Sequence, residues 1–113
     1  MRIGAIDDPV REVAAEILQW GRAQQIAVDI DLPVDAMPVA DVTDLRSILS
    51  QAYPLARGAT SARLSARTED SALVVRLVIA GCYECEVLPQ SVDSAAMVCL
   101  GEGDLMVEAR YVR

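Results

Sequence analysis

Four residue types are missing from the sequence: histidine, lysine, asparagine and phenylalanine. Without histidine the chain has no imidazole for general base catalysis, metal binding or phosphotransfer. Without lysine it has neither a Schiff-base nucleophile nor the lysine of a phosphate-binding loop. One tryptophan and three tyrosines are too few for an aromatic platform on which nucleic-acid bases stack. These absences exclude most familiar catalytic constellations.

Charge of one sign predominates, with 17 acidic residues against 10 arginines and a formal net charge of −7. Such a charge repels phosphate backbones and anionic lipids, so neither nucleic acid nor a membrane is expected as a partner. No apolar run approaches the roughly 20 residues of a membrane-spanning helix. Three cysteines, with no basic and apolar signal segment at the start, predict a cytoplasmic protein with reduced thiols.

What is present is enough for one domain covering residues 1–113. Of the 113 residues 53% are hydrophobic, which supplies one buried core built from alanine, valine, leucine, isoleucine and methionine. Hydrophobic periodicity, capping residues and turn residues predict strands at 2–6, 26–32, 61–68, 72–80 and 104–112, and helices at 9–25, 43–53 and 91–100. Asp41 or Thr43 is expected to cap the second helix.

This order of elements predicts an α/β (α+β) two-layer sandwich. One mixed, mostly antiparallel sheet is covered on one face by three helices, and the strands 61–68 and 72–80 form an antiparallel hairpin. Alternating carboxylates such as Asp29 with Asp31, and Glu84 with Glu86, are typical of the solvated side of a strand rather than of an acid/base pair.

Four stretches of the sequence resemble a known family. They are REVAAEILQWGRAQQIAVDIDLP, LRSILSQAYPLA, ALVVRLVIAG and LGEGDLMVEARYV, in this order along nearly the whole chain. Together they are similar to the ATP-binding domain of bacterial sensor histidine kinases, a fold shared with the ATPase part of DNA gyrase and with the Hsp90 chaperones. The resemblance implies the two-layer fold described above.

The motifs by which that family binds nucleotide are replaced in this chain. The family's second helix bears a Glu and, four residues later, an Asn that holds Mg²⁺, and the matching positions are Gln51 and Leu55. The family's central strand ends in Asp-x-Gly-x-Gly, whose Asp takes the adenine amino group. Here that stretch begins with Ile79, which cannot accept the bond, and continues with Gly81. The Gly-rich lid is replaced by residues 82–90, which contain no glycine.

The resemblance therefore implies a degenerate, nucleotide-free domain without catalytic activity or cofactor. Such a domain forms the C-terminal half of certain alphaproteobacterial histidine phosphotransferases, where it docks a response regulator. The expected partner is a protein of two-component-type signalling, such as a response regulator or a kinase, and the first helix could also mediate a homodimer. Trp20 and Tyr83 are the candidate interaction residues, because aromatic side chains are enriched at the centres of interfaces.

Two alternatives stay open. The spacing Cys82-Tyr83-Glu84-Cys85 could serve a thiol-based redox or metal site, with Cys99 as a third ligand and a carboxylate such as Glu84, Glu86 or Glu102 as the fourth. The acidic neighbours, however, raise rather than lower a thiol pKa. The other alternative is a weak ATP- or ADP-binding site near Gln51.

Overall fold

The computed structural model describes residues 9–32, 42–56, 58–82, 90–99 and 103–112. In chain order the elements are α1 (Pro9–Gln24), β1 (Ala27–Asp31), α2 (Thr43–Ala52), the short 3₁₀ helix η2 (Tyr53–Leu55), β2 (Ser61–Glu69), β3 (Ala72–Ala80), β4 (Gln90–Val92), β5 (Ala95–Cys99) and β6 (Leu105–Val112). None of the helices in these ranges is long and apolar enough to cross a membrane. The strand expected at 2–6 lies outside the described residues.

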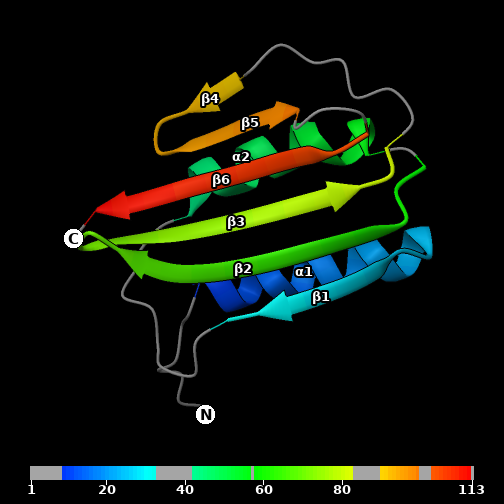
Figure 1. Ribbon diagram of the computed structural model, residues 1–113, viewed down its shortest axis with the longest axis horizontal. Coiled ribbons are helices and arrows are strands. Elements are labelled where there is room, and N and C mark those ends of the chain that lie inside the picture. The colour runs from blue at the N-terminus through cyan, green and yellow to red at the C-terminus, as the bar shows by residue number, and fades with distance from the viewer. Residues whose placement is uncertain (1–8, 33–41, 57, 83–89, 100–102, 113) are drawn as a thin grey trace.

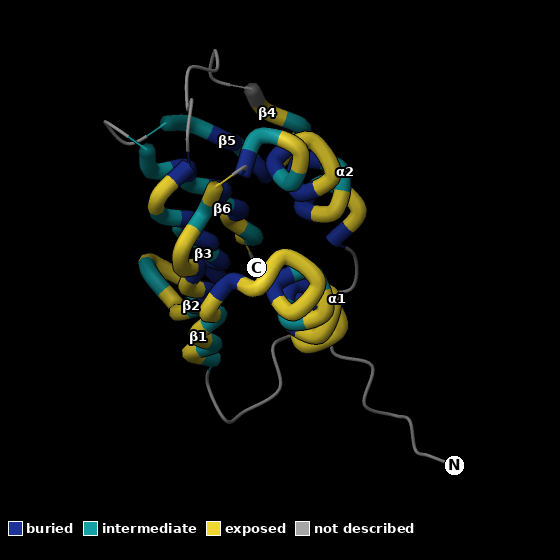
Figure 2. The backbone as a smooth tube through the Cα atoms, turned by 90° about the vertical axis from the view of Figure 1, so that its right-hand side faces the viewer, coloured by how far each residue is buried: buried dark blue, intermediate teal, exposed yellow. Residues whose placement is uncertain are grey.

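Six strands form one sheet in the order β1-β2-β3-β6-β5-β4. The pair β1–β2 is parallel and the other four pairs are antiparallel. Figures 1 and 2 show α1 and α2 on the same side of the sheet, with α1 near β1 and β2 and α2 near β4 and β5. No described helix lies on the other side, which we call the open face.

The helices form because their apolar residues recur at helical spacing. Pro9 stands at the first position of α1, where its fixed φ suits a helix and its missing N–H costs nothing. The buried stripe of α1 is Val10, Val13, Ala14, Ile17 and Gly21, and that of α2 is Leu45, Ile48, Leu49 and Ala52. Helix α2 is preceded by Val42 without a side-chain cap, contrary to the expected capping by Asp41 or Thr43.

The core lies between the helices and the central strand. Strand β3 has β2 and β6 on its two sides, and the side chains that it turns toward the helices are all buried: Leu73, Val75, Leu77 and Ile79. The predicted hairpin of β2 and β3 is confirmed, with Ser61 opposite Ala80 and Glu69 opposite Ala72. The alternation of β3 thus separates a core-facing set from the open-face set Ala72, Val74, Arg76, Val78 and Ala80.

The third predicted helix is wrong, and with it the three-helix sandwich. Residues 91–99 form the strands β4 and β5, joined at Asp93 and Ser94. In β5 the side chains of Ala95 and Met97 are buried, whereas that of Ala96 between them is only half-buried. This period of two fits a strand, and β5 obtains its hydrogen bonds by pairing with β6. A helix of this length would be only marginally stable by itself. The pairing of β5 with β6 therefore outweighs the helix-capping residues at the start of the segment.

The turn between β2 and β3 offers a direct test of backbone strain. Asp70 and Ser71 have φ values of 47° and 65°, the left-handed conformation that two-residue hairpin turns require and that glycine adopts best. We expect Ser71→Gly to raise the free energy of unfolding by roughly 0.5–1 kcal/mol. Urea denaturation measures this change. Ser65→Gly, inside β2, is the matched control and should lower stability; a loss in both variants would contradict the turn assignment.

Candidate interaction surface on the open face of the sheet

The positions that match the family's nucleotide contacts do not form a polar site. Ile79 is fully buried, with 0% of its surface exposed, and belongs to the core cluster. Leu55 packs against the edge of the same core. Gln51 is exposed on α2, away from the buried stripe of that helix. At the position where the family has its adenine-binding aspartate, this chain therefore has a buried apolar side chain, which cannot accept a hydrogen bond from an adenine amino group.

Gly81 is explained by the backbone rather than by a ligand. Its φ is +86°, and a Cβ placed on it would lie 2.8 Å from Thr60 Oγ1 and 3.1 Å from the Thr60 backbone nitrogen. The Thr60 amide itself donates to the Ala80 carbonyl at 2.9 Å, so it is held in place. The glycine lets the end of β3 pass close to the start of β2.

Gly81→Ala is therefore expected to lower the free energy of unfolding by roughly 1–3 kcal/mol, because it adds both a clash and an unfavourable φ. Thermal unfolding of the two proteins measures the loss. A change below about 0.5 kcal/mol, the level typical of uncritical surface sites, would contradict this account of the glycine.

Of the three cysteines of the possible thiol site, the structure describes Cys82 and Cys99. Cys82 is free and buried, and its pKa is raised, chiefly by burial and then by Asp104. A nucleophilic thiol needs the opposite shift. Cys99 is disulfide-bonded, so the expectation of three reduced thiols is wrong for this residue. Within the described ranges no three metal-ligating side chains come together. Cys85 lies outside those ranges.

These thiol states predict a simple titration. In the non-reduced protein we expect Cys99 not to react with a thiol reagent, because it is disulfide-bonded, and Cys82 to carry a free thiol. This thiol should react with iodoacetamide slowly in the native state, since burial and its raised pKa keep it protonated, and rapidly in denaturant. Mass spectrometry counts the labels. Three labels without a reductant, or fast labelling of native Cys82, would contradict the assignment.

Trp20 lies in the seam between the two helices. Its ring stacks on that of Tyr53, with centroids 5.0 Å apart and an interplanar angle of 26°. Nearby, Arg46 of α2 contacts Glu16 at 3.1 Å and Glu12 at 3.5 Å, both on α1. The pKa of Tyr53 is raised, first by burial and then by Glu16. Trp20 thus joins α1 to η2 and is partly buried; Tyr83 lies outside the described residues.

A pocket of about 360 Å³ lies between the start of α2, the β4–β5 turn and β6. The Asp44 carboxylate accepts bonds from Tyr111 Oη at 2.8 Å, the Ser94 amide at 3.0 Å and the Leu45 amide at 2.8 Å. Both of its oxygens are therefore occupied by groups of this chain. Asp44 ties three elements together and leaves little capacity for a ligand, so we assign it a structural role.

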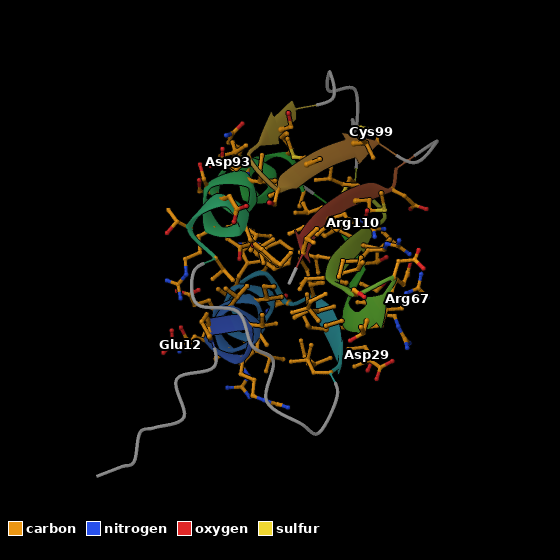
Figure 3. All side chains as sticks on the ribbon, turned by 90° about the vertical axis from the view of Figure 1, so that its left-hand side faces the viewer. Glu12, Asp29, Arg67, Asp93, Cys99 and Arg110 are labelled. Atoms are coloured by element: carbon orange, nitrogen blue, oxygen red, sulfur yellow. The ribbon has the colours of Figure 1, made fainter. Side chains whose placement is uncertain are left out.

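Besides the charged groups between the helices and at Asp44, the open face of the sheet carries a further group of charged side chains. Figure 3 shows Asp29, Arg67 and Arg110 on the side of the sheet opposite the helices, with Glu12 on the helix side. The strand register groups the side chains of the open face into five rows: Ala27–Ser61–Ala80, Asp29–Arg63–Val78–Met106–Val98, Asp31–Ser65–Arg76–Glu108–Ala96, Arg67–Val74–Arg110, and Glu69–Ala72–Val112.

The charges of this face are paired with one another. Arg63 contacts Asp29 at 2.9 Å and Asp31 at 3.1 Å. The carboxylate of Glu69 lies between the guanidinium groups of Arg67 and Arg110, the latter at 3.8 Å. The third group is the pair Arg76–Glu108 in the middle of the sheet, at 2.6 Å.

As a result the described charges of the open face sum to zero although the chain is acidic. Its described residues include four arginines and four carboxylates, so the net charge of −7 lies entirely on the rest of the chain. A neutral face can approach another protein without the repulsion that the remaining surface generates.

Apolar side chains lie beside these ion pairs. Val98, Met106 and Val78 are neighbours on three adjacent strands, and all three are half-buried. Next to Val78 a shallow groove of about 510 Å³ is lined largely by small residues, among them Ala27 and Ala80. Val74 is buried on this face and lies between the two arginines of its row.

Comparison with known proteins assigns no family to this chain. No protein-family model matches it, and no curated protein matches its sequence significantly. The function must therefore be inferred from the residues and their geometry.

The open face was missed in the sequence. Alternation along the strands does place Arg63 and Arg67 on one side of 61–68, and Glu108 and Arg110 on one side of 104–112. Only the register, however, shows that Arg76 meets Glu108 and that each charge has a partner. Asp29 with Asp31 was interpreted as a solvated face, and the structure adds that both carboxylates pair with Arg63.

Proposed function

We propose that this chain is a cytoplasmic, non-catalytic protein-interaction domain of bacterial two-component-type signalling, resembling a kinase ATP-binding domain without its nucleotide contacts. Its partner is a response regulator, a kinase or a second copy of the chain. The observation that carries the proposal is the open face, a wide sheet surface whose described charges sum to zero and on which the apolar side chains of Val78, Val98 and Met106 are half-buried.

The positions of the nucleotide motifs support the non-catalytic part of the proposal. A buried isoleucine at position 79, together with a glycine at position 81 that serves the backbone, leaves no acceptor for adenine. The raised pKa of the buried Cys82 thiol speaks against the alternative of a thiol-based redox site. A disulfide at Cys99 is unusual for a cytoplasmic protein, so thiol labelling inside cells, before lysis, also tests the compartment.

The test is a binding measurement with defined partners. The full chain is immobilised, and purified receiver domains and kinase cytoplasmic portions from the same genome are passed over it. We expect saturable binding of at least one of them, weakened at least tenfold by Arg76→Glu on the open face. Arg46→Glu is the matched control, because it makes the same change in an ion-paired arginine on the helix side. Stabilisation of the chain by Mg-ATP, or no binding in the panel, would contradict the proposal.

A further inference from the structure

The central ion pair of the open face has unused bonding capacity. Arg76 Nε lies 2.8 Å and Arg76 Nη2 lies 2.6 Å from the same carboxylate oxygen, Glu108 Oε2. Within the described part of the chain, Arg76 Nη1 and Glu108 Oε1 take part in no hydrogen bond. The pair is also only partly covered, with 36% of the arginine and 27% of the glutamate side chain exposed. A second guanidinium and a second carboxylate can therefore bind here.

This pair also lies at the centre of the face. Arg76 is the middle residue of β3, and Glu108 is its direct neighbour on β6. The row on one side of it contains Val78 beside Met106, and the row on the other side contains Val74 beside Arg110. A two-fold axis that runs along the strands, midway between β3 and β6, exchanges the members of each of these pairs.

We propose that the open face packs against the same face of a second copy of this chain about that axis. Arg76 of each copy then lies over Glu108 of the other, and Val78 lies over Met106. The four charges form a closed ring, in which the free Nη1 donates across the interface to the free Oε1. The inference rests on the proposed function only in taking the open face as a binding surface.

The charge pattern selects this axis over the alternative. A two-fold axis perpendicular to the strands through the central row would place Arg76 over Arg76 and Glu108 over Glu108, and such like-charge contacts are strongly unfavourable. Face-to-face sheets pack with their strands roughly aligned, so both arrangements are sterically ordinary. Charge complementarity therefore favours the axis along the strands over the axis perpendicular to them.

The charge distribution also selects the face. Outside this face the described residues carry six carboxylates and three arginines, so two copies that approach through those surfaces repel each other, whereas the described charges of the open face sum to zero. The strands cover roughly 600 Å² of sheet at about 3.3 Å per residue and about 4.8 Å between strands. Two such faces reach the lower end of standard interfaces, which fits a dissociation constant of about 1–100 µM.

Charge exchange between two variants tests the pairing. Sedimentation velocity of the wild-type chain is expected to show a monomer–dimer equilibrium in this range. Arg76→Glu alone and Glu108→Arg alone should each weaken the dimer at least tenfold, because like charges then face each other. Mixing the two variants should restore it as a heterodimer, since each copy supplies what the other lacks, although neither regains its own internal pair. A defect in folding could not be repaired by mixing.

Controls and opposing outcomes are defined on the same chain. Arg46→Glu, on the helix side, should leave the dimer unchanged. Wild-type chain that stays monomeric up to about 1 mM, well above the expected range, or a mixture that fails to associate, would overturn the pairing. To test the axis, Val78→Cys is mixed with Met106→Cys and oxidised mildly, which should give a cross-linked heterodimer. Cross-linking of Val78→Cys with Val74→Cys instead would indicate the perpendicular axis and overturn the proposed one.

The two proposals fail in different ways. A monomeric chain that binds a receiver domain through Arg76 keeps the signalling function and overturns the paired dimer. A dimer with the expected exchange behaviour that binds no receiver domain or kinase keeps the paired sheets and overturns the signalling assignment.

Discussion

Ile79→Asp is expected to unfold the protein, or to lower its free energy of unfolding by more than about 4 kcal/mol. The substitution introduces a carboxylate at the position that matches the adenine-binding aspartate of the kinase ATP-binding domains that the sequence resembles. In this chain, however, the side chain is fully buried among apolar residues, between β2 and β6 and under the helices. A charge there has no partner, and the core loses the isoleucine as well. Circular dichroism during urea unfolding measures the effect.

The adjacent position provides the control for this experiment. Val78 precedes Ile79 on β3 but points to the open face, where it is only half-buried. Val78→Asp, compared at a concentration at which the chain is monomeric, should cost no more than about 1 kcal/mol, because the carboxylate remains in water. If Ile79→Asp folded with near wild-type stability and gained affinity for Mg-ATP, a nucleotide cleft would exist beside Ile79, and our interpretation of that region would be wrong.

Asp44→Ala is expected to have the second-largest effect, a loss of roughly 2–4 kcal/mol. The carboxylate accepts three hydrogen bonds, and hydrogen bonds to charged groups contribute about 1.5–3 kcal/mol each when they are well shielded. Here the site is partly exposed, so the sum is smaller. The carboxylate also lies in the first turn of α2, where a negative charge stabilises the helix.

A double-mutant cycle separates the contribution of the tyrosine. Tyr111→Phe removes only the hydroxyl that donates to Asp44 and should cost about 1 kcal/mol. Because the two side chains share that bond, the double variant should lose less than the sum of the single losses. Additive losses would show that the bond contributes nothing, and a loss below about 0.5 kcal/mol for Asp44→Ala would contradict its role in joining α2, the β4–β5 turn and β6.

Local patterns in the sequence were sufficient for the elements with strong periodicity. The stripe of α1 and the alternation of β3 each follow from the spacing of apolar residues, and the polar pair Asp70-Ser71 marks the hairpin turn between β2 and β3. The stretch 91–100 has small and apolar residues without a clear period, so its conformation depends on β6, a strand that lies later in the chain. Local capping signals could not reveal that pairing.

Most of the candidate site could not be predicted from the sequence, because it also depends on contacts between residues that are far apart in the chain. Glu108 lies 32 residues from Arg76, and Tyr111 lies 67 residues from Asp44. Such contacts are fixed by strand register and by the packing of α2, and neither can be read from residue spacing alone. The loss of the nucleotide motifs, which was inferred from the residue types at four positions, stays a prediction, because no family model or curated protein matches the chain.

The parallel pairing of β1 with β2 has a consequence for how the chain folds. β2 and β3 are joined by a two-residue turn, as are β4 and β5, so these hairpins can form within microseconds once their own residues are available. β1 must wait, because its partner β2 begins 30 residues after β1 ends and α2 lies in the loop between them. Closing that loop costs entropy before any β1–β2 contact is made. Of the described strands, the one synthesised first is thus expected to be among the last to join the sheet.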